Sequence, residues 1–330
     1  TATPGAATSD TSRKNTMVSS NASRWGLDIS EKLGGGLTAI AKLEQQINAD
    51  GEGNSQDTRN RYVGMKGKFG QIIAGTNDTP FKNISRDIEL FPEYIGDNRN
   101  IMSTGGNNGQ GWDLRPANVI QYNTPDMNGF TFTYNYSADT TAAAAVEDNR
   151  RRADSYGLKY AKGPLYVNFA IETHRLSSIA DGGKETEQGQ RLGASYNFGA
   201  FKLVAMHQSL SDLGGTVSGG TKVKRTSYVV GGAFTAGNNV FKAQYVKAGS
   251  LSNTSTGASA TDTGAKLWAL GWDHLFSKTT KMYVAYAKTD NDTNSTFAVN
   301  GPSAGAHGDF IAPVAGGDPS GWSLGMIVDF

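Results

Sequence analysis

Apolar and polar residues alternate along most of this chain, in segments of strand length separated by short polar or glycine-rich stretches. In the first segment Trp25, Leu27 and Ile29 share one face, and the residues between them share the other. Side chains alternate between the two faces of a β-strand, and glycine-rich turns between such runs are hairpin signals. The pattern predicts about fifteen strands. They span residues 24–30, 37–44, 58–68, 71–76, 114–122, 130–136, 156–161, 165–174, 189–197, 201–209, 225–235, 240–247, 264–274, 280–288 and 322–330.

The connections between these predicted strands alternate in length. Short turns of a few residues alternate with long polar loops. The long loops lie at residues 48–57, 139–152, 175–188, 210–224, 249–263 and 290–319. A soluble sandwich has no physical reason to gather all of its long loops at one end. A bacterial outer-membrane barrel has short turns at one end and long loops at the other, and its strands need about 9–11 residues. The pattern therefore predicts an all-β, antiparallel transmembrane β-barrel.

The beginning of the chain does not follow this pattern. Residues 1–21 are mostly Thr, Ala, Ser and Asn with little periodicity, which indicates an N-terminal arm or loop. Bacterial barrels have an even number of strands, and an open sheet edge in lipid would leave backbone groups unpaired at several kcal/mol each. We therefore expect either a further strand before Thr1 or an unconventional pairing of the arm.

One long segment, residues 78–113, interrupts the alternation for 36 positions. Loops of this length within a β meander are uncommon unless they have a function or are disordered. Disorder does not fit this segment, because it carries large apolar residues: Phe81, Ile84, Ile88, Leu90, Phe91, Tyr94, Ile95 and Trp112. It also carries charges of both signs: Asp87, Glu89, Glu93 and Asp97 against Lys82, Arg86 and Arg99. Such a segment can fold back against a polar wall and narrow a space. The alternative is an ordinary surface excursion.

The composition suits a barrel and excludes several other classes of protein. Hydrophobic residues make up 37% of the 330 residues, which is low for a globular protein but suits a barrel with a polar lumen. A net charge of +1 leaves no basic stripe for a nucleic acid. Cysteine is absent, the four histidines are dispersed, and no nucleophile elbow or phosphate-binding loop is present. We therefore expect no enzyme, no cofactor and no metal site, apart from adventitious cation binding near residues 290–294.

Five segments resemble one known family when they are taken in order and with their spacing. They are SRWGLDISEKLGGGLTAIAKLE (23–44), RYVGMKGKFGQIIAG (61–75), RPANVIQYNTPDMNGFTFTYNYS (115–137), GWDHLFSKTTKMYVAYAKTDND (271–292) and GMIVDF (325–330). This set is similar to the general porins of the Gram-negative outer membrane, of the beta-proteobacterial and neisserial type. The resemblance implies a single 16-stranded barrel domain over residues 1–330 and three barrels per complex. It also implies a third long loop folded into the pore as its constriction, and residues 78–113 lie where that loop belongs.

The resemblance further implies a row of arginines on the wall that faces this loop. The matching positions are Arg24, Arg59 and Arg115, and Arg61 lies beside them; the loop acids Asp87, Glu89, Glu93 and Asp97 would face them. An arginine that faces lipid near mid-membrane costs about 2–4 kcal/mol, so Arg24 and Arg115 are expected to point into the lumen. The alternative role is structural, in which the arginines pair with Asp87 or Glu89 and hold the loop. The Gln121 position is often basic in the family, which favours a less positive pore here.

The end of the chain and one outer face carry two further predictions. Gly325, Val328 and the final residue, Phe330, follow the alternation of the assembly signal with which porins end. Ala39, Ala41 and Gly64 are predicted to point outward. Small residues on an outer face allow barrels to pack wall to wall, as a trimer requires.

These observations favour an outer-membrane porin with a water-filled channel for passive diffusion of ions and small hydrophilic solutes. A modest preference for anions is expected, because the wall is basic and the loop is mildly acidic. The expected partners are two further copies of the chain, outer-membrane lipid and lipopolysaccharide, and no nucleic acid. The alternatives are a channel selective for organic anions and, from another class, an outer-membrane barrel enzyme or an adhesin.

Overall fold

The computed structural model describes residues 16–50, 58–103, 111–138, 152–176, 185–213, 222–300 and 313–330. The strands are β1 (Arg24–Gly34), β2 (Leu37–Gln46), β3 (Thr58–Gly67), β4 (Gly70–Thr76), β5 (Val119–Asn123), β6 (Phe130–Ser137), β7 (Arg152–Lys162), β8 (Leu165–Leu176), β9 (Glu185–Phe198), β10 (Phe201–Leu213), β11 (Val223–Ala236), β12 (Asn239–Ala248), β13 (Ser252–Asn253), β14 (Ala265–Leu275), β15 (Thr280–Asn291) and β16 (Ser320–Val328). The helices are α1 (Pro80–Asp87) and α2 (Arg99–Met102). Within the described residues, neither helix is long and apolar enough to cross a membrane.

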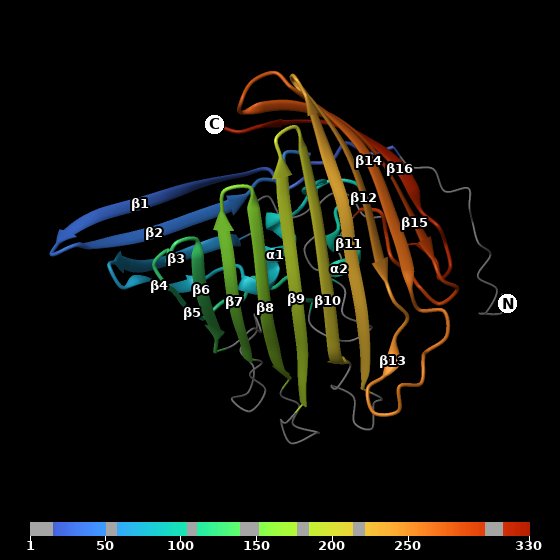
Figure 1. Cartoon of the computed structure of the whole chain (residues 1–330), viewed down its shortest axis with the longest axis horizontal. Helices are drawn as coiled ribbons and strands as arrows, with labels where there is room; N and C mark the ends of the chain where they lie inside the picture. Colours follow the sequence, from blue (N-terminus) through green and yellow to red (C-terminus); the bar gives the residue numbers. More distant parts are fainter. Residues whose placement is uncertain are drawn as a thin grey trace.

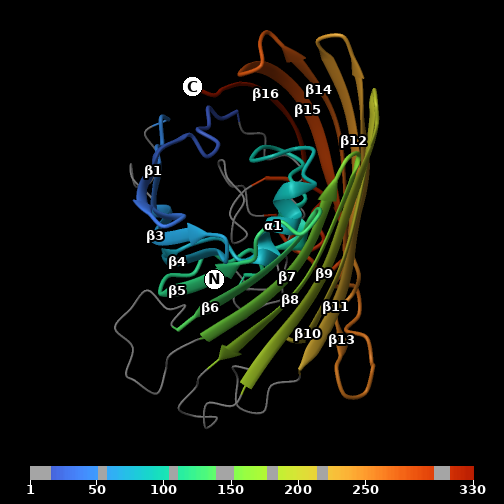
Figure 2. The ribbon, with the colours of Figure 1, turned by 60° about the vertical axis from the view of Figure 1, so that its left-hand side comes forward.

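The sixteen strands form one antiparallel sheet that curls around the two helices (Figures 1 and 2). Neighbours in the sheet are neighbours in the chain from β1 to β12 and from β14 to β16, and β14 pairs directly with β12. The short strand β13 pairs only with β11. The chain is therefore all-β with a barrel-type sheet of sequential hairpins, as the alternating pattern predicts.

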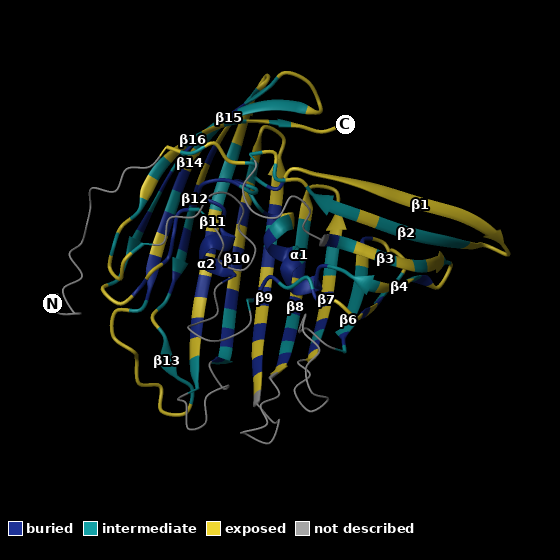
Figure 3. Cartoon of the chain, turned by 180° about the vertical axis from the view of Figure 1, so that it is seen from behind, coloured by how far each residue is buried: buried dark blue, intermediate teal, exposed yellow. Residues whose placement is uncertain are grey.

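Exposed side chains alternate with more buried ones along many of the strands, such as β10, β11 and β16, whereas β1 is exposed along its whole length (Figure 3). On β16, for example, Trp322, Leu324 and Met326 point outward and are 75%, 71% and 62% exposed. Soluble monomers rarely expose so continuous an apolar surface, and lipid is the environment that suits it. The inward faces of β8–β12 instead carry a mixture of buried small, polar and apolar residues, which is where the helices pack.

The predicted strands are in the right places, but several boundaries differ. β8 and β9 run further than predicted, so residues 175–176 and 185–188 of the predicted loop belong to strands. β5 begins at Val119 and not at residue 114. The chain before it still belongs to the preceding loop, because Asn118 adopts the left-handed φ of 54° and Ser137 donates its hydroxyl to the Ala117 carbonyl.

The short connections gather at one end of the sheet, as predicted from their lengths (Figure 1). The turn between β1 and β2 is an example: Gly35 adopts φ 57°, which a glycine reaches without steric cost. Parts of the long predicted loops, at residues 51–57, 139–151, 177–184, 214–221 and 301–312, lie outside the described residues. So do residues 1–15 of the predicted arm, and residues 16–21 form neither helix nor strand.

The last strand places the three residues of the predicted assembly signal. Gly325 points inward against the Tyr283 ring, where an added Cβ would lie 2.6 Å from the ring carbon Cζ. Val328 ends β16 on the outward face, and Phe330 is fully exposed beyond it. Their role in assembly stays a prediction.

The prediction that Gly64 points outward, where it would serve trimer packing, is wrong. Gly64 faces the lumen, because an added Cβ there would lie 2.8 Å from the Ile73 side chain, and Ile73 is buried on the inner face of β4. Ala39 and Ala41 keep the predicted outward direction, since they alternate with the inward residues Thr38, Ile40 and Lys42.

Candidate functional site: the loop inside the sheet and the wall it approaches

The segment between β4 and β5 lies inside the curved sheet and carries both helices (Figure 2). Helix α1 begins where its sequence requires: Thr79 is the N-cap, its hydroxyl accepts the Lys82 N–H at 3.3 Å, and Pro80 occupies the first turn. The helix packs against the inner faces of β7, β8 and β9, and α2 packs against β12. The described part of this segment, residues 78–103 and 111–113, forms what we call the inner loop.

Apolar side chains dock the inner loop because the wall provides glycines opposite them. An added Cβ at Gly157 on β7 would lie 2.7 Å from Pro80, and one at Gly271 on β14 would lie 2.7 Å from the Phe91 ring. Gly193 on β9 makes similar room for Ile84. The docked side chains are fully buried: Phe81, Ile84, Ile88, Phe91, Ile101, Met102 and Trp112. Burial of each such side chain contributes about 1.5–3 kcal/mol, so the docked position is strongly favoured.

One arginine of the wall ties the two ends of the inner loop together. Arg191 on β9 donates to the Phe81 carbonyl at 3.0 Å, to the Asp113 carboxylate at 2.8 Å and to the Met102 carbonyl at 3.2 Å. Its guanidinium carbon lies 4.1 Å from the centre of the Phe81 ring, and the side chain is fully buried. Gln208 on β10 accepts from the same guanidinium. Arg191 therefore fixes the beginning and the end of the loop to one strand.

A second buried contact holds the end of the inner loop. The Trp112 ring stacks on the His174 ring of β8, with 4.2 Å between ring centres, and the His174 Nε2 lies 2.8 Å from the Glu172 carboxylate. Arg191 and His174 were not among the site residues predicted from the sequence. The signal for Arg191 was present, because Gly189, Arg191 and Gly193 alternate with larger side chains and thus share one face of β9.

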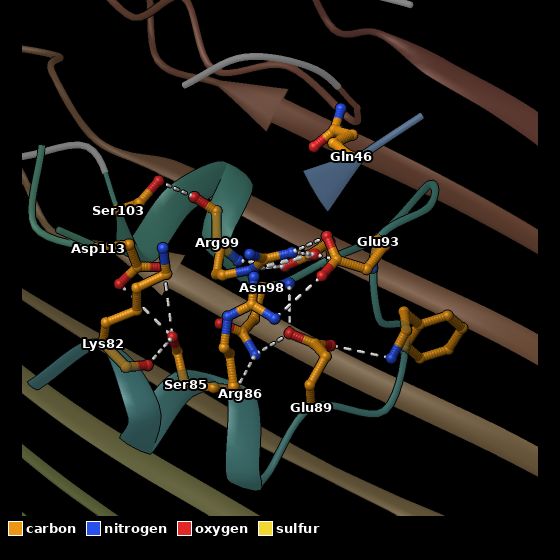
Figure 4. A network of polar contacts seen from close by, with 12 residues as sticks. Gln46, Lys82, Ser85, Arg86, Glu89, Glu93, Asn98, Arg99, Ser103 and Asp113 are labelled. Atoms are coloured by element: carbon orange, nitrogen blue, oxygen red, sulfur yellow. Dashed lines mark hydrogen bonds and ion pairs between the residues drawn. The ribbon is translucent and has the colours of Figure 1, made fainter. Parts of the chain in front are cut away.

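Two of the loop acids chosen from sequence serve the loop itself, and Figure 4 shows Glu89 among the polar groups of the loop. Glu89 accepts the N–H groups of Leu90 at 3.0 Å, Phe91 at 2.9 Å and Asn98 at 3.3 Å. Asp97 pairs with the buried Arg99. Burial and the neighbouring Asp97 raise the pKa of Glu89 well above its usual range, whereas the N–H donors favour the ionised form.

The other two predicted acids face different parts of the wall. Glu93 lies 3.7 Å from Arg24 on β1, and it also pairs with Arg86 at 3.0 Å and with Arg99 at 2.9 Å. Asp87 ends α1 and accepts the Tyr166 hydroxyl of β8. Of the four predicted acids, Glu93 is therefore the one for which the described residues include an ion pair with a wall arginine.

Three of the four predicted arginines point into the lumen, and each has a carboxylate partner. Arg24 reaches Glu93 on the loop, Arg59 pairs with Glu44 on the adjacent strand, and Arg115 pairs with Asp78 at 2.9 Å. The Arg24 side chain is 42% exposed, whereas Arg59 is almost fully buried. Arg24 is thus the wall arginine with the most open access to the lumen.

Arg61 does not belong to this wall, and the prediction that it lies beside Arg59 there is wrong. Between β2 and β3 the register shifts, so that Leu43 pairs with Arg61 but Gln45 pairs with Thr58. Such a bulge gives β3 one extra residue and puts Arg59 and Arg61 on opposite faces. Arg61 is exposed on the outward face, beside Leu43.

We define the constriction cluster as the charged groups where the inner loop approaches the wall. Its cations are Arg24, Arg59, Lys82, Arg86, Arg99 and Arg115, and its carboxylates are Glu44, Asp78, Glu89, Glu93 and Asp97. The cations outnumber the carboxylates even when Glu89 is ionised. Burial alone would raise the pKa of Asp78, but the charges of Lys82 and Arg115 hold it well below its usual range. The cluster therefore carries an excess of positive charge at neutral pH.

Comparisons with known proteins agree with this arrangement. The family model described as Gram-negative porin matches residues 2–294. Outer membrane porin protein 32 of Delftia acidovorans is 30% identical over 298 residues, which cover 87% of this chain and 79% of that protein. Major outer membrane protein P.IA of Neisseria meningitidis serogroup C is 27% identical over 335 residues, or 89% of this chain and 84% of that protein.

Solved structures show the same fold. The anion-selective porin from Comamonas acidovorans superimposes with a TM-score of 0.74 at 27% identity, over 94% of this chain and 90% of that one. OmpT of Vibrio cholerae, solved in a trimer form, superimposes with a TM-score of 0.67 over 96% of this chain and 94% of that one. At 17% identity, the second likeness shows the fold alone. The chain belongs to the Gram-negative porin family, and is accordingly an outer-membrane channel for passive diffusion and not an enzyme.

Proposed function

We propose that this porin passes ions and small hydrophilic solutes with a modest preference for anions, and that the inner loop is its constriction. The observation that carries the proposal is the excess of cations in the constriction cluster. Charged side chains that line a narrow passage set its ion selectivity, and fixed charges that are partly buried are weakly screened. The preference is modest because Arg24 and Arg59 on the wall, and Arg115 just before β5, each have a carboxylate partner.

One relative supports the same direction. The porin from Comamonas acidovorans, which is 27% identical, is named an anion-selective porin. In this chain, Arg24 is open to the lumen, so an anion that crosses the pore passes close to its positive charge.

Liposome swelling tests this function. Liposomes that contain the protein should swell in small neutral sugars and in small organic anions alike, with anions entering faster than cations of equal size. A channel selective for organic anions would instead exclude the neutral sugars, and its conductance would saturate with the preferred anion. Absence of swelling in every solute would contradict a pore of either kind.

The pH dependence of selectivity is a second consequence of the cluster. Burial lowers the pKa of Lys82 to about 8, although the adjacent Asp78 raises it. Lys82 is a base, so it loses its positive charge as the pH rises through about 8. Anion preference should therefore decline between about pH 7 and pH 9.5. A Lys82→Arg variant keeps its charge over this range and should show a much smaller decline. An equal decline in both proteins would exclude Lys82 as the cause.

We further propose that the barrel works as a homotrimer in outer-membrane lipid and lipopolysaccharide. Porins of this family are typically trimeric. The outward faces of β1 and β2 support the proposal, because the small Ala39 and Ala41 lie opposite Glu31 and the exposed Ile29 and leave room there. Protein in a mild detergent should have three times the mass of one chain and should dissociate to monomers only on heating. A monomer with full channel activity in the same detergent would contradict the proposal.

A further inference from the structure

Several lysines that do not belong to the constriction cluster face the lumen near the short turns. Lys66 on β3 and Lys202 on β10 each lie next to a turn, and Lys159 on β7 lies one further pleat inside. Strand register gives their direction: Lys159 pairs with the buried Asn168, and Lys202 lies two residues from the buried Val204. Gly67 faces outward, because an added Cβ there would meet the outward Leu37 side chain. Lys66, the residue before it in the strand, therefore faces the lumen.

The environment of Asp87 agrees with this direction. Asp87 ends helix α1 inside the sheet. Burial raises its pKa, whereas the Tyr166 hydroxyl and the charges of Lys159 and Lys202 lower it. Two lysines from separate strands thus act on one carboxylate of the inner loop, which places both ammonium groups on the lumen side.

These lysines differ from the cations of the constriction cluster in their partners. Within the described part of the chain, no carboxylate lies within 4.0 Å of the ammonium groups of Lys66, Lys159 or Lys202. Lys281 on β15 also faces the lumen near a turn and pairs with Asp273 at 3.0 Å. Asp273 also pairs with Lys242 at 2.7 Å. The group of two lysines and one carboxylate therefore retains a positive charge as well.

We propose that Lys66, Lys159, Lys202 and Lys281, the mouth lysines, form a ring of positive charge at the short-turn mouth that concentrates small anions on that side of the pore. Their strands, β3, β7, β10 and β15, are spread around the sheet. A mouth lined by charge of one sign raises the local concentration of the opposite ion. The inference rests on the proposed anion preference and adds a second, independent source of it.

Salt dependence distinguishes the two sources. The mouth lysines line a water-filled opening, where screening acts over about 10 Å at 0.1 M salt and about 3 Å at 1 M. Their contribution should therefore disappear at high salt, whereas charges at the narrowest point act on ions within a few ångströms. Because the ring lies at one end, it should also make the current at low salt unequal for the two voltage signs.

The test compares two triple variants in planar bilayers. Lys66→Gln, Lys159→Gln and Lys202→Gln together should lower the anion/cation permeability ratio about twofold in 0.1 M KCl, and should leave it unchanged in 1 M KCl. The matched control replaces Lys224, Lys247 and Lys266 by Gln. These three lysines face outward near the long loops, so the control removes equal charge and should change neither value.

The outcomes separate this inference from the proposed function. The proposed lysine ring would be overturned by an unchanged permeability ratio in 0.1 M KCl, or by an equal decrease of the ratio in 0.1 M and 1 M KCl. The wild-type anion preference would stand in either case. A wild-type channel that prefers cations would overturn the proposed function itself. The mobility shift on heating, measured for every variant, establishes that its barrel has assembled.

Discussion

Channels with Arg191 replaced by methionine are expected to show a larger and less steady unitary conductance than the wild type. Arg191 holds Phe81, Met102 and Asp113 to β9 from a fully buried position. Its removal breaks these contacts and leaves the buried Asp113 carboxylate without its cation, which costs about 3–5 kcal/mol. The inner loop should then leave its docked position for part of the time. Single-channel recording measures the effect directly.

Two further variants keep this prediction testable. Arg175→Met on the neighbouring strand removes an exposed arginine and should leave the conductance as in the wild type. Adding Asp113→Asn to Arg191→Met removes the uncompensated charge and should restore part of the steadiness. A steady wild-type conductance in an assembled Arg191→Met barrel would show that apolar docking alone holds the loop.

The double variant Arg24→Ser, Arg115→Ser should lose most of the anion preference and enlarge the pore. Two charges act on an ion at about 10 Å with about 0.4 kcal/mol each in water, and anions and cations are affected with opposite sign. The permeability ratio should thus fall several-fold, in low and in high salt. Unlike the mouth lysines, these arginines lie where the loop and the wall meet.

An outward arginine supplies the control for this variant. Arg61→Ser removes a positive charge from the opposite face of β3 and should leave selectivity unchanged. If the double variant kept the wild-type ratio, Arg24 and Arg115 would serve only to brace the loop through Glu93 and Asp78. The charge filter would then have to lie elsewhere in the lumen.

Strand positions could be predicted from the sequence because they depend on a local pattern. Trp25, Leu27 and Ile29 must share a face whatever the rest of the chain does. The face of Arg59 could not be predicted in this way. Its direction depends on a bulge opposite Glu44, and a bulge is a property of the pairing between two strands.

The contacts of the loop acids could not be derived from composition either. Glu89 was expected to face the wall arginines, but it accepts N–H groups of its own loop. A carboxylate next to several unpaired backbone donors is better satisfied locally than across a water-filled gap. The resemblance to porins implied that residues 78–113 fold into the pore, and the described part of this segment lies inside the sheet (Figure 2). The glycines that receive it, such as Gly193, become informative only once the strand faces are known.

The reversal potential of the wild-type channel in a tenfold KCl gradient tests the central claim most directly. Potassium and chloride have nearly equal mobilities, so the sign of the potential reports the charge of the pore. An excess of cations in the constriction cluster predicts a potential of the sign set by chloride, smaller than that of an ideal anion channel. It should persist when both solutions are made more concentrated at the same ratio. A potential of the opposite sign, or none at all, would contradict the account.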